Sequence, residues 1–134
     1  MIKRLKIDIP GAARTKKNSN RIINRKVNGK LIPMVIPSKA FIEYQELCGW
    51  HIRQKDIKIN YPVNVKCVYY MPTKRRVDLV NLLEATMDIL VHYGVLEDDH
   101  SRIVVSHDGS RVLYDKESPR TEVWIEAVEE DGVE

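Results

Sequence analysis

Alternating apolar and polar residues predict three strands in this chain. Residues 2–9 (IKRLKIDI) alternate apolar with charged positions, as a half-buried strand does, and Pro10 ends the pattern. Residues 63–71 (VNVKCVYYM) lie between two prolines and are rich in β-branched and aromatic residues, which predicts a second strand. Residues 121–128 (TEVWIEAV) alternate again and predict a closing strand.

Two segments between these strands have helical spacing instead. Ser38 is a good N-cap, and the apolar residues that follow it predict a helix running to about Gln54. A second helix is expected to begin at or just after Asp78. It should run to about Tyr93, because Gly94 is a typical C-terminal stop.

Two hairpins complete the expected elements. Residues 23–37 (INRKVNGKLIPMVIP) place an Asn-Gly pair, a strong two-residue turn signal, between two runs of strand-forming residues. Residues 102–106 and 111–114 flank an Asp-Gly turn and are expected to pair with each other. The resulting order of elements predicts an α+β fold, with a mixed or antiparallel sheet and two helices packed on it.

Composition narrows the class of protein. The 134 residues fit one domain, in which residues 129–134 are expected to form a frayed acidic tail. No apolar run approaches the length of a membrane span, and the first ten residues do not have a signal-peptide pattern, so we expect a cytoplasmic protein. Cys48 and Cys67 have apolar neighbours and no metal-ligand spacing, which predicts buried free thiols.

The charges are strongly asymmetric along the chain. Residues 1–60 carry 14 Lys and Arg against 4 Asp and Glu, a balance of +10. Residues 61–134 carry 8 against 15, a balance of −7. A basic half predicts a polyanionic partner, and an acidic half predicts a metal site, a solvated tail, or both.

Residues 74–99 combine cations with carboxylates. Lys74, Arg75 and Arg76 directly precede the second helix and could hold phosphates, whereas carboxylates hold a hard metal ion. One stripe of this helix carries four polar side chains, and an acidic cluster follows the helix. The stripe is Asp78, Asn81, Glu84 and Asp88, and the cluster is Glu97, Asp98 and Asp99. Solvated surface, a helix N-cap at Asp78 and a polar turn at 97–99 are the simpler readings.

A second basic segment, ARTKKNSNR at residues 13–21, suits phosphate contacts or is a plain surface loop. Its candidate DNA-binding residues are Lys16, Lys17, Asn18, Asn20 and Arg21. The chain has no Gly-rich phosphate loop, nucleophile elbow or zinc motif, so no organic cofactor is expected.

In these segments the chain resembles the RusA family of Holliday junction resolvases. The resemblance rests on KKNSNR, YYMP, RRVDLVN and GVLEDD in this order, and it covers nearly the whole chain. Members are small homodimeric, Mg²⁺-dependent endonucleases of bacteria and their prophages. The resemblance therefore implies branched DNA as partner, Mg²⁺ (with Mn²⁺ as an alternative) as cofactor, and a role in DNA recombination and repair.

The resemblance also implies the site residues. Asp78 and Asp99 match catalytic, metal-binding positions, and Asn81 is retained. The family pattern has a second aspartate where this chain has Val80, and a lysine where it has Glu84. Either Glu84 or Asp98 supplies the missing ligand in an active nuclease, or the chain binds branched DNA with impaired cleavage. A protein-interaction domain with solubilising charges is a third hypothesis.

Overall fold

A computed structural model gives the structure of the chain and describes residues 1–16 and 21–129. The strands and helices follow one another as β1 (Arg4–Pro10), β2 (Arg21–Val27), β3 (Lys30–Ile36), α1 (Lys39–His51), β4 (Val63–Met71), α2 (Leu79–His92), β5 (Val104–Ser106), β6 (Arg111–Tyr114) and β7 (Arg120–Ala127). Neither helix is long and apolar enough to cross a bilayer within these described residues.

Five strands form a mixed sheet. The order is β1-β7-β4-β5, and β6 also pairs with β4. β7 is antiparallel to both β1 and β4, whereas β5 and β6 run parallel to β4. With two helices beside a sheet of both strand orientations, the predicted α+β class is confirmed.

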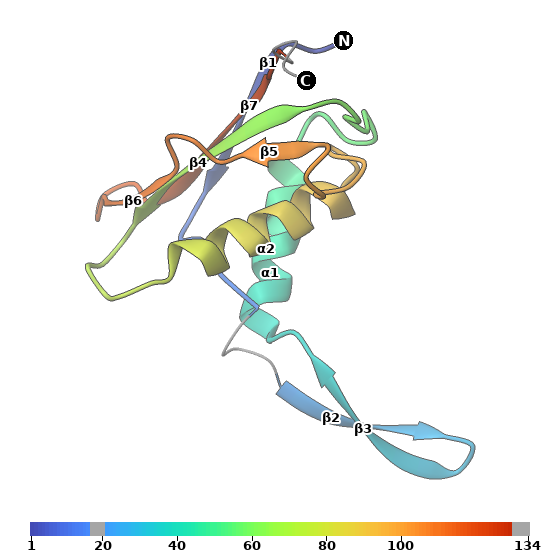
Figure 1. The fold of residues 1–134 in the computed structure, drawn as a ribbon. Coiled ribbons are helices and arrows are strands. Elements are labelled where there is room, and N and C mark those ends of the chain that lie inside the picture. Colours follow the sequence, from blue (N-terminus) through green and yellow to red (C-terminus); the bar gives the residue numbers. More distant parts are fainter. Residues whose placement is uncertain (17–20, 130–134) are drawn as a thin grey trace.

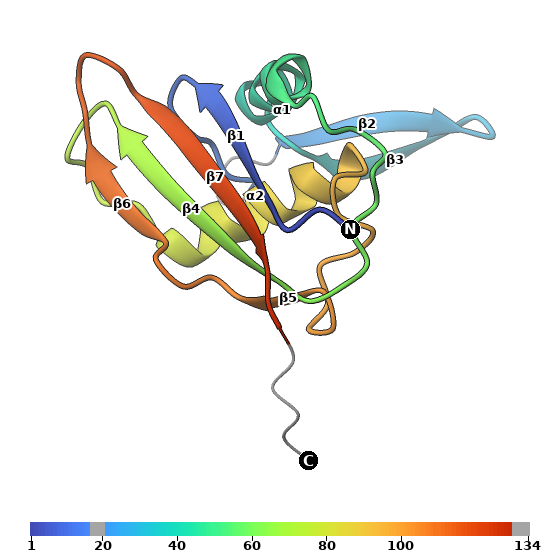
Figure 2. The ribbon, with the colours of Figure 1, turned by 90° about the horizontal axis from the view of Figure 1, so that it is seen from above.

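The core lies between one face of the sheet and the two helices (Figures 1 and 2). Alternate residues of β1, β4 and β7 are buried, as the period of two requires. Tyr69 of β4 and Thr86 of α2 share a buried hydrogen bond of 2.6 Å, so the polar groups of this interface are satisfied. Cys48 and Cys67 are buried free thiols, as predicted, and burial raises the pKa of each to about 12.

The predicted pairing of residues 102–106 with 111–114 is wrong. β5 pairs with Val63 and Asn64, and β6 pairs with residues 68–71, so both lie along the same edge of β4. Side chains of the loop between them satisfy β4 in the gap. His107 Nδ1 lies 2.9 Å from the Val65 carbonyl oxygen, and the Ser110 hydroxyl accepts a hydrogen bond from the Cys67 N–H. Side chains of this loop therefore bond to the backbone of β4 where no strand pairs with it, and the loop is not the turn of a hairpin between β5 and β6.

The first helix begins as predicted but ends earlier. Ser38 is its N-cap and accepts a hydrogen bond from the Phe41 N–H. The helix ends at His51, not Gln54, and Ile52 is extended. The segment that follows pairs with the chain beyond α2, where the Ile59 N–H donates to the Val95 carbonyl at 3.0 Å. This distant pairing fixes the end of α1.

The predicted hairpin around Asn28 and Gly29 is confirmed. β2 and β3 pair in an antiparallel register across this turn, whose residues have φ values of 50° and 78°. The two strands form a separate sheet that projects from the rest of the molecule (Figure 1).

Candidate active site

A cleft of about 1070 Å³ lies at the start of α2. Three segments far apart in the sequence line it: the loop after β1, the start of α1, and the connection from β4 into α2. Its polar and charged lining residues are Arg14, Thr15, Ser38, Thr73, Arg75, Arg76, Asp78 and Asn81. Three arginines and the N-terminus of a helix therefore face one hollow, an arrangement that attracts anions.

Asp78 is the N-cap of α2. Its Oδ1 accepts hydrogen bonds from the Val80 N–H at 2.9 Å and from the Asn81 N–H at 3.4 Å. The predicted N-cap at Asp78 is thus confirmed. This role leaves the residue able to bind a ligand in the cleft as well. The cap uses Oδ1, so Oδ2 is the oxygen that a cation could bind.

The basic run before Asp78 divides between two places. Arg75 and Arg76 line the cleft. Lys74 instead has its ammonium 5.3 Å from the centre of the Tyr114 ring, at the end of β6. The two arginines are therefore placed to act together on an anion in the cleft, whereas Lys74 is not among the residues that line it.

The polar stripe of α2 continues from the cleft into a small hollow. Asn81 lines both, and Lys16, Glu84 and Asp88 surround the hollow. The Lys16 ammonium lies 3.4 Å from Asp88 Oδ2. A cation thus sits against the acidic stripe, and it comes from the basic loop after β1. Of the other predicted residues of this loop, Lys17, Asn18 and Asn20 lie outside the described residues, as does the side chain of Arg21.

The second acidic cluster lies beyond the other end of α2. The Asp99 N–H donates to Asp98 Oδ1 at 2.7 Å, and both residues are exposed. The 14 residues of α2 span about 21 Å, so the helix separates this cluster from Asp78 within one chain. β5 follows the cluster and pairs with the start of β4, whereas Asp78 follows the end of β4.

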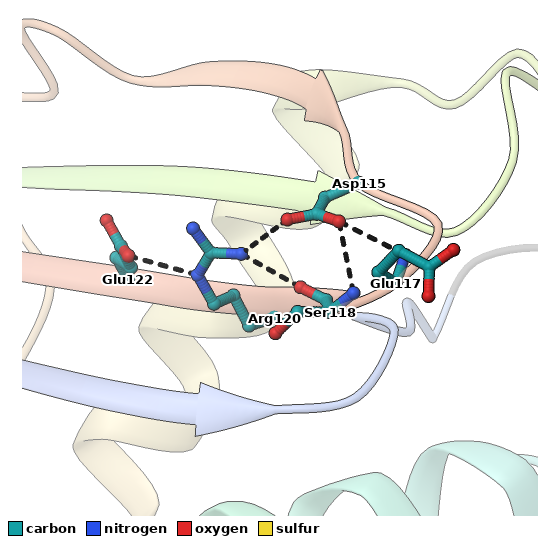
Figure 3. Close-up of polar contacts among 5 residues, drawn as sticks. All are labelled: Asp115, Glu117, Ser118, Arg120 and Glu122. Carbon is teal, nitrogen blue, oxygen red and sulfur yellow. Dashed lines mark hydrogen bonds and ion pairs between the residues drawn. The ribbon is translucent and has the colours of Figure 1, made fainter.

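A polar network braces the end of β4, where the chain leaves the sheet for the cleft (Figure 3). The Arg120 guanidinium donates to Asp115 Oδ2 at 2.9 Å and to Glu122 Oε2 at 3.1 Å, and it lies 3.8 Å from the centre of the Tyr70 ring. Hydrogen bonds from the Ser118 N–H and from Arg120 lower the pKa of Asp115. The Asp115 N–H donates to the Met71 carbonyl, which ties this network to the strand end.

Sequence reasoning missed Arg14, Thr15 and Ser38 as cleft residues, and it missed the Arg120 network. Arg14 and Thr15 lie in the basic loop that composition had already singled out, so their residue types were an available signal. Arg120 and Glu122 are two positions apart on β7 and share a face, which would have predicted their ion pair.

The predicted metal ligands do not gather in one place in the part of the chain that the structure describes. Among residues 1–16 and 21–129, no group of three or more His, Cys, Asp or Glu side chains is close enough to hold an ion. Asp78 lies in the cleft at one end of α2, and Asp98 and Asp99 lie beyond the other. Among the described residues, the predicted ligands Asp78 and Asp98–Asp99 therefore lie at opposite ends of α2.

A cleft lined by three arginines and a carboxylate is typical of proteins that bind and process nucleic acids. Comparison with known families agrees with this class. The sequence model of the family described as Endodeoxyribonuclease RusA matches residues 10–126, so the chain belongs to the RusA endodeoxyribonuclease family. A comparison with curated proteins found no match. The family comprises Holliday junction endonucleases that bind branched DNA and generally depend on a divalent metal.

Proposed function

We propose that this chain is a Mg²⁺-dependent endonuclease that resolves four-way DNA junctions by phosphodiester hydrolysis. One observation carries the proposal: the fold brings Arg14, Arg75 and Arg76 into one cleft with Asp78, which the resemblance to the RusA family implies is a catalytic carboxylate. The three arginines come from two segments that are distant in sequence, so their convergence is a property of the fold.

The residues of the cleft position a DNA backbone. Arginine binds phosphate oxygens through a planar pair of N–H groups, and Arg75 and Arg76 supply two such pairs beside the N-terminus of α2. The partial positive charge of that terminus adds to them. The negative charge of Asp78 would repel a phosphate group that entered the cleft without a cation. A cation bound beside both groups would offset this repulsion, so the arrangement favours a bound cation.

The proposed metal ligands are Asp78, Asp98 and Asp99, with Glu84 as the substitute for the aspartate that Val80 replaces. Because about 21 Å of helix lies between the two groups, carboxylates from both ends of α2 can share an ion only if two copies contribute them. We therefore propose that the active form is a homodimer. Two sites related by a two-fold axis also match the two-fold symmetry of a four-way junction.

A catalytically impaired junction-binding protein is the second candidate, and Val80 favours it. This side chain is 67% exposed in the first turn of α2, two residues after Asp78. It is not among the residues that form or pack against the core, and it offers no oxygen to a metal. In this alternative the cations of the cleft still bind DNA.

Incubation with a labelled four-way junction, with and without Mg²⁺, separates the candidates. The nuclease gives Mg²⁺-dependent nicks near the crossover and leaves a linear duplex of the same sequence intact. The binding protein shifts the junction in a gel without cutting it in Mg²⁺ or Mn²⁺. In both cases log affinity should fall with log salt at a slope of roughly −4 to −8. A flat salt response contradicts both and favours a protein-interaction domain.

A further inference from the structure

The β2–β3 hairpin has no place in the core of its own chain. Every described side chain from Ile22 to Val35 is exposed, and the two strands pair only with each other in the sheet arrangement. Figures 1 and 2 show the hairpin extending away from the five-stranded sheet and both helices. A two-stranded hairpin without further packing is marginally stable in water.

Both faces of this hairpin are apolar. The register places Ile22, Leu31 and Val35 on one face, where they are 66–72% exposed. The opposite face carries Ile23, Val27, Ile32 and Met34, which are 37–43% exposed. Large apolar surfaces of this kind mark contact sites. Phosphates and solvated base edges do not cover seven such side chains, so the composition favours a protein partner over DNA.

The outer edge of β3 is protected from pairing with another strand. In a hairpin with a two-residue turn, the residues that flank the turn are hydrogen-bonded to each other, and the next pair along is not. By this alternation Pro33, opposite Asn24, lies where a backbone N–H would point away from β2. Proline has no N–H to offer there. The partner therefore meets the faces of the hairpin and not this edge.

The charge of the hairpin indicates the kind of surface it meets. Residues 21–36 carry four cations and no carboxylate, whereas the rest of the chain has 18 cations and 19 carboxylates. Three of the cations, Arg25, Lys26 and Lys30, lie towards the turn, and the strand ends nearer the body are mainly apolar. The matching surface should be apolar with carboxylates among its apolar residues.

The outward face of α1 has this character. Ile42 and Trp50 are 37% and 83% exposed, and Glu46 lies between them at spacings of four residues on the same face. Glu43 is also exposed beside them. A tryptophan this exposed is a typical centre of a protein interface.

We propose that the hairpin is an arm that packs on the outward face of α1 of a second copy of this chain. Ile22, Leu31 and Val35 would cover Ile42 and Trp50, and Lys26, the cation that the register places on this same face, would face Glu43 and Glu46. A two-fold axis makes the exchange reciprocal, so one dimer contains the contact twice. This inference shares only the dimer with the proposed function, and its main test, the mass of the chain in solution, needs neither DNA nor metal.

Sedimentation of the full chain without DNA is the test. The wild type should sediment with twice the 15.6 kDa mass of one chain. The double variant Ile22→Glu/Val35→Lys exchanges a directly opposed pair for opposite charges, so the hairpin register and net charge are kept. It should raise the dimer dissociation constant by at least about tenfold, as should Trp50→Ala on the receiving surface. Val105→Lys, at a residue of β5 that is 43% exposed, is the matched control and should leave the constant unchanged.

Three results would overturn the proposal. The first is a wild type that sediments as a single chain at every concentration. The second is a dimer whose dissociation constant responds to the hairpin variant but not to Trp50→Ala, because the arm then docks elsewhere. The third is a hairpin variant that loses junction affinity while its mass is unchanged, because the hairpin is then a DNA contact. Unfolding curves that match the wild type show that each variant is folded.

Discussion

The two ends of α2 carry carboxylates in opposite electrostatic settings. At its start, Asp78 shares a cleft with Arg75 and Arg76 and with the positive end of the helix dipole. Beyond its far end, Asp98 and Asp99 follow Glu97 in an exposed turn, so three consecutive carboxylates concentrate negative charge there. Phosphate is therefore favoured at the first end and a cation at the second. Under the proposed function, neither end is a complete site, and two copies are needed to join them.

The largest effects are expected from one carboxylate at each end. Asp78→Asn and Asp99→Asn should each reduce junction cleavage by about 100-fold or more, because under the proposed function each removes a charged metal ligand. Asparagine is as good an N-cap as aspartate, so Asp78→Asn leaves the start of α2 intact. Junction affinity should be equal or higher, since a negative charge near phosphate is lost. Cleavage and gel-shift assays on the same preparations measure both.

The control for these two variants is Glu117→Gln, which removes an exposed carboxylate in the turn before β7. It should cleave like the wild type. Loss of binding together with cleavage in Asp78→Asn would instead give this residue a purely structural role.

The basic run tests the phosphate-binding end. Arg75→Gln and Arg76→Gln should each weaken junction binding by about tenfold and reduce the salt slope by about 1, because under the proposed function each removes one phosphate contact. Lys74→Gln should have a smaller effect, because Lys74 lies over Tyr114 outside the cleft lining. Equal effects at all three positions would mean that charge alone, and not the cleft, governs binding.

The departures from the family pattern should have moderate effects on cleavage. Val80→Asp places a carboxylate two residues after Asp78 at an exposed position, so it should raise cleavage a few-fold without loss of stability. Glu84→Gln should lower cleavage by roughly tenfold if Glu84 is a substitute ligand, which is less than Asp78→Asn because Glu84 lies beside Lys16 and Asp88. Normal cleavage by Glu84→Gln would remove Glu84 from the ligand set. Cleavage by Val80→Asp alone, with an inactive wild type, would identify an impaired nuclease.

The smallest effect concerns the brace behind the cleft. The folded-state pKa of Asp115 is lowered, so its contribution to stability is present above the unfolded-state pKa and is lost as pH falls through the folded-state value. Asp115→Asn should therefore be slightly less stable than the wild type at neutral pH and indistinguishable from it in acid. Urea unfolding at both pH values measures this. A difference that persists in acid would mean that lost hydrogen bonds, and not charge, account for the change.

Local signals in the sequence were sufficient for much of the fold. The alternation of Leu5, Ile7 and Ile9 and the caps at Ser38 and Asp78 depend on neighbouring residues alone. Both helices begin where their caps place them, and β1 at Arg4–Pro10 overlaps the predicted strand at 2–9 with its ends shifted. The end of α1 and the pairing of β5 and β6 depend on β4 and on the chain after α2, which are far away in sequence. For the same reason Arg14 and Ser38 could not be assigned to one cleft.

Mixed dimers test most directly whether two copies complete the site. Asp78→Asn and Asp99→Asn chains with different affinity tags are co-expressed, and dimers that carry both tags are purified. If each site combines Asp78 of one chain with Asp99 of the other, one site has both substitutions and the second has neither. We predict that these dimers nick the junction at roughly half the wild-type rate, since one of two sites is intact. Mixed dimers as inactive as either parent variant would contradict the account, because each site would then lie within a single chain.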